Sequence, residues 1–267
     1  MRTSRIFLVL LLISSFSKCS FAQSPAGFQS LTIYPRSIAS SGMGEQGVAS
    51  MSALEAMQYN PANLVYADGI VTSFFRNPGN LIALIGSSYP FTSVNVVREL
   101  ENGTGIGVEY TYKDYGEFNV ISPQDPNNIE TFHYYERSLA GGYAMSLSNQ
   151  LAIGAQLRYA WQPRPYFFNQ PNYTHDYLDH LFFSTGASYK PVIFSDRLNI
   201  GISFMNFSTS IEYGSHVDTI NGQAVNIAES DPPPSQINIG IEGLVVTNDF
   251  FQLNLSVDAT KPLDKKN

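Results

Sequence analysis

The sequence of 267 residues contains a single cysteine, Cys19, and few charged residues. With no second cysteine, the chain cannot form an internal disulfide or a zinc–thiolate cluster. Charged residues make up 14% of the chain, whereas typical soluble domains contain about a quarter. Aromatic residues are almost as frequent, at 13%. Something other than charge must therefore cover much of the surface.

Basic residues and catalytic motifs are also scarce. The chain has 15 Lys and Arg against 22 Asp and Glu. No cluster of basic residues marks a nucleic-acid interface, so we expect no nucleic-acid partner. The sequence has no HExxH motif, no nucleophile elbow and no P-loop lysine. We expect a protein that is not an enzyme and that uses no cofactor.

The N-terminus has the features of a secretory signal peptide. Arg2 and Arg5 precede an unbroken apolar run over residues 6–13, which is too short to span a bilayer. Ser20-Phe21-Ala22 offers the small-x-small pattern for cleavage. We expect residues 1–22 to be removed during export through the Sec pathway, which leaves the mature chain without cysteine.

Beyond residue 70 the sequence alternates at period two, as strands do. In 150–161, Leu151, Ile153 and Leu157 share one face, and Gln156 and Arg158 share the other. Such alternation fits a secreted soluble antiparallel sheet with the apolar face inward. It fits a transmembrane barrel with the apolar face toward lipid equally well. The segments with this alternation are 106–113, 150–161, 198–204, 237–242 and 251–258.

The connections between these segments favour the barrel. Short turns at 148–150, 191–196 and 247–249 alternate with long polar stretches at 119–130, 163–178 and 207–235. Outer-membrane barrels have short periplasmic turns and long outer loops. The sequence therefore predicts an all-β fold, a transmembrane antiparallel β-barrel over residues 69–267. A secreted soluble β-sandwich is the alternative.

The predicted barrel is incomplete. The chain stops in a polar turn, residues 261–267, where outer-membrane barrels commonly end in a strand with a terminal aromatic. We count about nine or ten strands, and bacterial single-chain barrels have an even number. We expect that the chain is C-terminally truncated and lacks its last strands.

Residues 42–47 read GMGEQG, which fits the dinucleotide-binding pattern G-x-G-x-x-G. That pattern belongs between a strand and a helix of a parallel sheet. Pro35 interrupts the preceding segment and no second β-α-β unit follows, so we expect no nucleotide site. A helical pattern lies near 50–59 and ends at Asn60-Pro61, because the residue before proline is pushed out of the helical region.

Two N-terminal segments resemble a known group of outer-membrane proteins. Ser41-Gly42-Met43-Gly44 and Tyr59-Asn60-Pro61-Ala62-Asn63-Leu64 are similar to the PorV/PorQ proteins, and through them to the FadL-type barrels. Segments 198–206, 234–240 and 257–264 extend the resemblance. It implies a barrel of about fourteen strands in the bacterial outer membrane, with a short helical plug over residues 23–68.

The resemblance also implies a function. PorV/PorQ proteins act in type IX secretion, which implies secreted cargo proteins and other secretion-system subunits as partners, besides outer-membrane lipid. FadL relatives instead admit hydrophobic small molecules through the barrel wall. The expected plug motif consists of Gly42, Gly44, Gly47, Asn60, Pro61 and Ala62.

Charged residues on the polar strand faces would line the lumen of such a barrel. They could pair with one another or with the plug, because buried charges need partners. These candidates are Glu109, Lys113, Arg158, Glu242 and Asp258. His175, Asp176, Asp179 and His180 lie close enough in sequence to suggest a metal site. An exposed polar loop explains them more simply, so we expect no metal.

Overall fold

The computed structural model describes residues 28, 30–77, 90–121, 129–163, 177–192, 197–220, 223–247, 250 and 252–263. The predicted signal peptide, residues 1–22, lies outside this part of the chain. Nine strands form one antiparallel sheet in the order β1-β2-β3-β4-β5-β6-β7-β10-β11, and β8 pairs with β9. The strands are β1 (Ile70–Asn77), β2 (Phe91–Leu100), β3 (Thr104–Ile121), β4 (Ile129–Ser146), β5 (Leu151–Pro163), β6 (Tyr177–Tyr189), β7 (Leu198–Phe207), β8 (Ile211–Ile220), β9 (Gln223–Asp231), β10 (Gln236–Thr247) and β11 (Gln252–Pro262).

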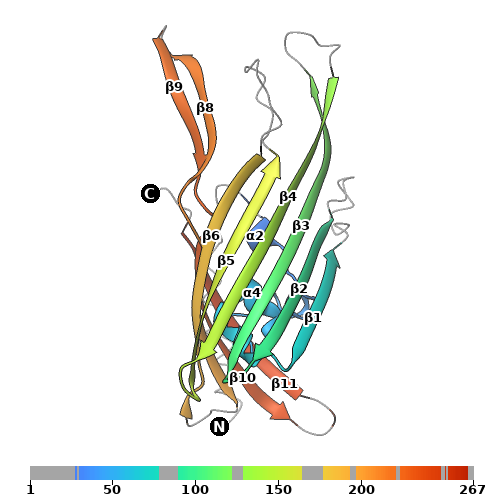
Figure 1. Cartoon of the computed structure of the whole chain (residues 1–267), viewed down its shortest axis with the longest axis vertical. Helices are drawn as coiled ribbons and strands as arrows, with labels where there is room; N and C mark the ends of the chain where they lie inside the picture. The colour runs from blue at the N-terminus through green and yellow to red at the C-terminus, as the bar shows by residue number, and fades with distance from the viewer. Residues whose placement is uncertain are drawn as a thin grey trace, which may run out of the picture.

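Chain neighbours are sheet neighbours throughout, apart from the β8–β9 hairpin inserted between β7 and β10. Short connections, such as 101–103 and 147–150, gather at one end of the sheet, which we call the turn end. The strand ends that are separated by longer stretches of sequence lie at the opposite, loop end (Figure 1). This arrangement confirms the predicted alternation of short and long connections. The stretch 207–235 is not a plain loop, however, because it contains β8 and β9.

The sheet curls around a set of short helices (Figure 1). It does not close in the part of the chain that the structure describes, because β1 and β11 form its two edges. The sequence predicted an antiparallel β-barrel that lacks its last strands. The structure confirms the antiparallel β fold, as an open, curved sheet. The described residues form eleven strands where the sequence suggested nine or ten, since β8 and β9 were read as loop.

The helices belong to one stretch, residues 30–67, which we call the inner segment. The helix predicted near 50–59 is shorter than expected. Ser52 is extended and its side chain caps a 3-10 turn, and Asn60 ends the α-helical turn that follows. No helix in the described ranges is long and apolar enough to cross a membrane. The elements are α2 (Ser30–Ile33), α3 (Ile38–Gly42), η1 (Ala53–Glu55), α4 (Ala56–Tyr59) and η2 (Pro61–Tyr66).

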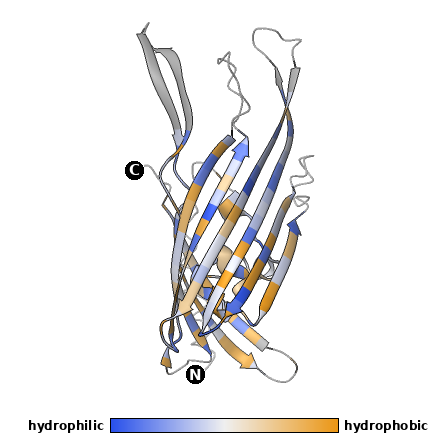
Figure 2. Ribbon diagram, in the orientation of Figure 1, coloured by the Kyte–Doolittle hydropathy of each residue, from blue (hydrophilic) through white to orange (hydrophobic). Residues whose placement is uncertain are grey.

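The sheet has an inverted polarity, by which we mean that polar side chains face the inner segment and apolar side chains face outward. Figure 2 shows hydrophilic and hydrophobic residues alternating along the strands. In β5, Gln156 and Arg158 are 2% and 1% exposed and face the inner segment, whereas Leu157 is 54% exposed and faces outward. The same holds on β7, where Ser203 is buried and Ile202 is 40% exposed. Fully burying one such aliphatic side chain is worth about 1.5–3 kcal/mol. The outer face of the sheet leaves this stabilisation unrealised at many positions, the reverse of the usual arrangement of a half-buried antiparallel sheet.

Small residues on the inner face let the inner segment approach the sheet closely. A Cβ added to Gly154 would lie 2.4 Å from the carbonyl carbon of Pro61, and one added to Gly201 would lie 2.1 Å from the Val48 oxygen. Cross-strand pairing joins these positions into a belt across the sheet. The small residues of the polar strand faces therefore lie in a crowded interior. Its members are Gly105, Gly107, Gly142, Ala144, Gly154, Gly186, Gly201 and Gly240.

The belt gives a matched test. Gly154→Ala should lower the free energy of unfolding by about 1–3 kcal/mol, because the new methyl group overlaps the backbone of Pro61 and Ala62. Gly141→Ala, on the outer face with nothing within 4 Å of its Cβ, should change it by less than about 0.5 kcal/mol. Thermal unfolding followed by circular dichroism measures both. Equal effects of the two substitutions would contradict the close packing.

Candidate functional site

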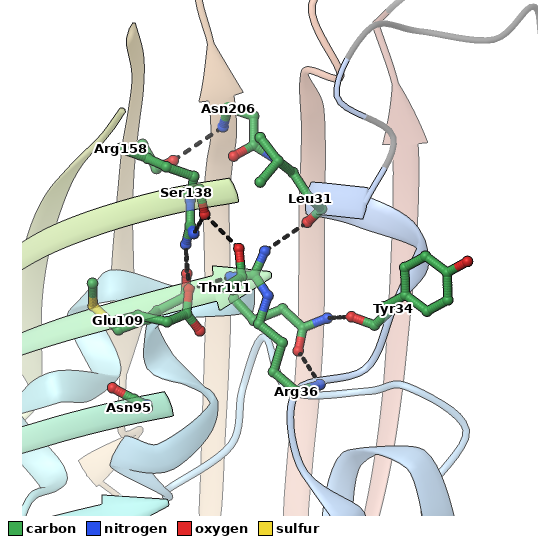
Figure 3. Close-up of polar contacts among 12 residues, drawn as sticks. Leu31, Tyr34, Arg36, Asn95, Glu109, Thr111, Ser138, Arg158 and Asn206 are labelled. Carbon is green, nitrogen blue, oxygen red and sulfur yellow. Dashed lines mark hydrogen bonds and ion pairs between the residues drawn. The ribbon is translucent and has the colours of Figure 1, made fainter. Parts of the chain in front are cut away.

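The interface between the inner segment and the sheet contains a buried ion triad (Figure 3). Glu109 on β3 lies between Arg36 of the inner segment and Arg158 on β5. One oxygen, Oε2, accepts from Nη1 of Arg36 and, at 2.6 Å, from Nη2 of Arg158. All three side chains are almost fully buried. Two of these residues, Glu109 and Arg158, were predicted to line a lumen, and the structure brings them together.

Each guanidinium of the triad also donates a hydrogen bond to a backbone carbonyl of the inner segment. Arg158 donates to the Met57 carbonyl at 3.0 Å, and Arg36 donates to the Leu31 carbonyl at 2.9 Å. Arg158 further donates to the Ser138 hydroxyl at 2.8 Å. Burial lowers the pKa of Arg36 to about 10, and the Glu109 carboxylate opposes that shift. Arg36 is therefore charged at neutral pH.

Nearer the loop end, Lys113 and Glu136 face the start of the inner segment. Glu136 accepts from the Ser30 backbone amide at 3.1 Å and from the Tyr115 hydroxyl at 3.0 Å. The Lys113 ammonium lies 4.1 Å from the centre of the Tyr34 ring. Glu136 was missed by the sequence analysis, although it falls on the same strand face as Ser138.

At the far side of the sheet, Asp258 on β11 binds the backbone of the glycine motif. Its Oδ2 accepts from the amides of Gly47 at 2.7 Å and Val48 at 2.9 Å. Glu242 on β10 is buried on the same inner face and accepts from the Met51 backbone. Both were predicted to face a lumen, and both contact the inner segment.

The Asn-Pro-Ala motif lies against β6. Asn60 donates to the carbonyls of Val48 at 2.9 Å and Ala187 at 3.0 Å, and its own oxygen accepts from Ala62 at 3.1 Å. Pro61 opens the 3-10 helix η2, as its missing amide allows. Asn60 thus links the backbone at Val48 and the start of η2 to strand β6. The sequence analysis did not find its counterpart Asn199, which donates to the Ala49 carbonyl at 2.8 Å.

The three glycines of the GMGEQG motif differ in role. Gly42 and Gly44 are exposed, and only Gly44 has a positive φ, of 77°. Gly47 is buried, and a Cβ there would lie 2.3 Å from the Tyr59 ring. Its lack of a side chain therefore permits the close approach of the Tyr59 ring.

Apolar groups enter this polar interior near the loop end. The Phe28 ring packs edge-on against Phe182, with ring centres 5.8 Å apart. Leu31, Ala160, Leu178 and Ile211 complete the cluster. At the turn end, where η2 finishes, a cavity of about 470 Å³ lies between Tyr66, Asn102, Ser146, Gln150 and Lys190.

Two of the histidine and aspartate residues predicted to form a polar loop, Asp179 and His180, lie on strand β6 and contact different partners. His175 and Asp176 lie outside the described residues. Asp179 accepts from the Tyr159 hydroxyl at 3.0 Å, and His180 contacts the Ser208 hydroxyl at 2.7 Å. No group of three or more metal-ligating side chains occurs in the described part of the chain.

Comparisons with known proteins give limited similarity. No protein-family model matches the sequence, and no curated protein matches it. Two solved structures resemble it, the toluene transporters TbuX from Ralstonia pickettii and TodX from Pseudomonas putida. TbuX is 17% identical, with a TM-score of 0.47 over 84% of this chain and 70% of its own. TodX is 12% identical, with a TM-score of 0.46 over 82% and 68%. Because both scores are below 0.5, the proposals below rest on this chain's own geometry.

Replacing Glu109 should loosen the inner segment. Glu109→Gln leaves two buried guanidinium groups facing each other, which costs about 3–5 kcal/mol. Tryptic cleavage after Arg36, which is buried, should accelerate by about tenfold or more. Mass spectrometry of a limited digest measures this rate. Glu101→Gln, in an exposed turn, is the control, and equal rates in both variants would contradict the role of the triad.

Asp258 should protect the glycine motif from exchange. Asp258→Asn keeps the shape but weakens two charge-assisted hydrogen bonds. Hydrogen–deuterium exchange of a peptide covering 46–50 should become about tenfold faster. Asp179→Asn, on the outer face, should leave that peptide unchanged. Unaltered exchange in Asp258→Asn would show that the carboxylate does not hold this segment.

Proposed function

We propose that this chain is an outer-membrane β-barrel protein whose inner segment, residues 30–67, acts as a plug. The inverted polarity of the sheet supports this proposal most directly. An apolar outer face suits lipid, and a polar inner face suits a lumen. The inner segment fills that lumen, and its backbone groups are bound by side chains from β2, β4, β5, β7, β10 and β11. Glu109 of β3 binds the Arg36 side chain of the same segment.

A membrane location requires the sheet edges to be covered. Unpaired backbone groups cost several kcal/mol each in lipid, and only closed barrels avoid them. The outer faces of both edge strands carry exposed apolar residues, including Phe74 on β1 and Leu255 on β11. We infer that further strands pair with β1 and β11 and close the barrel.

We propose further that the barrel admits hydrophobic small molecules. The cluster around Phe28 and Phe182 offers an apolar surface at the loop end of an otherwise polar interior. The cavity beside Tyr66 lies at the opposite end. Between them the inner segment is held largely by hydrogen bonds and ion pairs, which can be exchanged for water. Because this cluster is buried, an apolar solute would reach it and pass once the plug shifts.

A role in type IX secretion is the second candidate. The segments that carry the PorV/PorQ resemblance include Ser41-Gly42-Met43-Gly44, which is exposed on the side of the inner segment not covered by the sheet. That surface could contact a protein partner. The channel is favoured because the Phe28 cluster gives it a specific surface.

Three measurements test the proposal in order. The chain should fractionate with the outer membrane and show heat-modifiable gel migration, and recovery in the periplasm without a shift would exclude the barrel. Deletion should then impair uptake of an apolar probe such as toluene while the secreted proteins stay unchanged. Loss of secreted proteins with normal uptake would instead support the secretion role.

A further inference from the structure

The outer face of the sheet changes character toward its loop end. Cross-strand pairing lines up Tyr112 with Arg137, Arg137 with Trp161, and Trp161 with Asp179. One row nearer the turn end, the same four strands present only apolar and aromatic side chains, Tyr110, Leu139, Tyr159 and Leu181. An exposed apolar band thus ends in a row that contains one arginine.

Arg137 is framed by aromatic rings. The carbon of its guanidinium lies 4.5 Å from the centre of the Tyr135 ring and 5.3 Å from that of Tyr112. These are cation–π distances, which hold the planar group in place without neutralising it. In the described part of the chain, Arg137 forms no ion pair, and its Nε is buried without a hydrogen-bond partner.

The nearby acidic groups are already engaged. Asp179 accepts from the Tyr159 hydroxyl at 3.0 Å. Asp114 accepts from the Gly116 amide at 2.8 Å and contacts Nε2 of His133 at 2.9 Å. The guanidinium therefore keeps a positive charge that lacks a counter-ion among the described residues, at the border of the apolar band.

This combination has a specific chemical complement. A guanidinium presents a rigid fork of N–H donors that matches phosphate, and weak hydration makes it suited to interfaces. Aromatic side chains with a polar tip favour the boundary between lipid and water. The adjacent row around Leu139 would accommodate acyl chains. A guanidinium without a counter-ion is matched better by an anionic headgroup than by a zwitterionic one, because a zwitterionic headgroup already carries a positive charge beside its phosphate.

We propose that Arg137, together with Tyr112, Tyr135 and Trp161, binds the phosphate headgroup of an anionic lipid on the outer surface of the sheet. The proposal rests on the membrane location proposed above. The phosphate contacts the guanidinium, and the acyl chains run along Leu139 toward the turn end.

Native mass spectrometry of the full chain in non-ionic detergent tests this site. Dioleoyl phosphatidylglycerol and dioleoyl phosphatidylcholine are the probes, since they share acyl chains and differ in net charge. The wild-type chain should retain phosphatidylglycerol preferentially. R137Q should bind it about tenfold more weakly, and R137K about threefold more weakly, because lysine keeps the charge but loses the fork.

Arg98 provides the matched control. It lies exposed on the outer face of β2 near the turn end, so R98Q removes the same charge from the opposite end of the sheet. R98Q should bind phosphatidylglycerol as the wild-type chain does. Equal binding by R137Q and the wild type, or equal losses in R137Q and R98Q, would overturn the site.

Heat-modifiable migration separates this proposal from the previous one. A wild-type chain without it contradicts the membrane location and the lipid site together. A heat-modifiable chain whose phosphatidylglycerol binding does not depend on Arg137 overturns the lipid site alone. If R137Q loses heat-modifiable migration, it no longer reports on lipid binding, and R137K is measured in its place. Unchanged phosphatidylglycerol binding by R137K then overturns the site.

Discussion

Glu109 accepts from a guanidinium of the inner segment and from one of the sheet, at a place that water does not reach. A sheet with a largely polar inner face has only small apolar clusters on that side, around Met57 and around Phe28, so its stability depends strongly on partners for its buried polar groups. Arg36, Asn60 and the backbone of 47–57 supply those partners. Without the inner segment, the inner face would present unpaired charges.

This constraint explains the distribution of residue sizes. Where backbone meets backbone, at Gly154 and Gly201, the sheet has no side chain. Where the segment stands further off, Arg158 and Glu109 span the gap. The apolar residues are then left for the outer face, which suits lipid. Because the outer face is apolar, few residues of the whole sequence are charged.

The sequence predicted five strands with their two faces, β3, β5, β7, β10 and β11, because a period of two survives in residues such as Leu157 and Arg158. It could not tell which face points inward, since a soluble sheet has the same alternation, and only connection lengths favoured the membrane. The contacts of Glu136 and Asn199 were missed because they depend on long-range register. The secretion role led the interpretation of the sequence, whereas the Phe28 cluster, invisible in the pattern, favours a solute channel.

Site-directed spin labelling along β5 tests the inverted sheet most directly. The expected mature chain has no cysteine, so single cysteines can be placed from Leu151 to Ala160 without background labelling. Labels at odd positions such as Leu157 should be accessible to oxygen, which dissolves in lipid, and protected from a water-soluble nickel chelate. Labels at even positions such as Arg158 should be protected from both. Odd positions that respond to the nickel chelate instead would show that the apolar face is in water and would contradict the account.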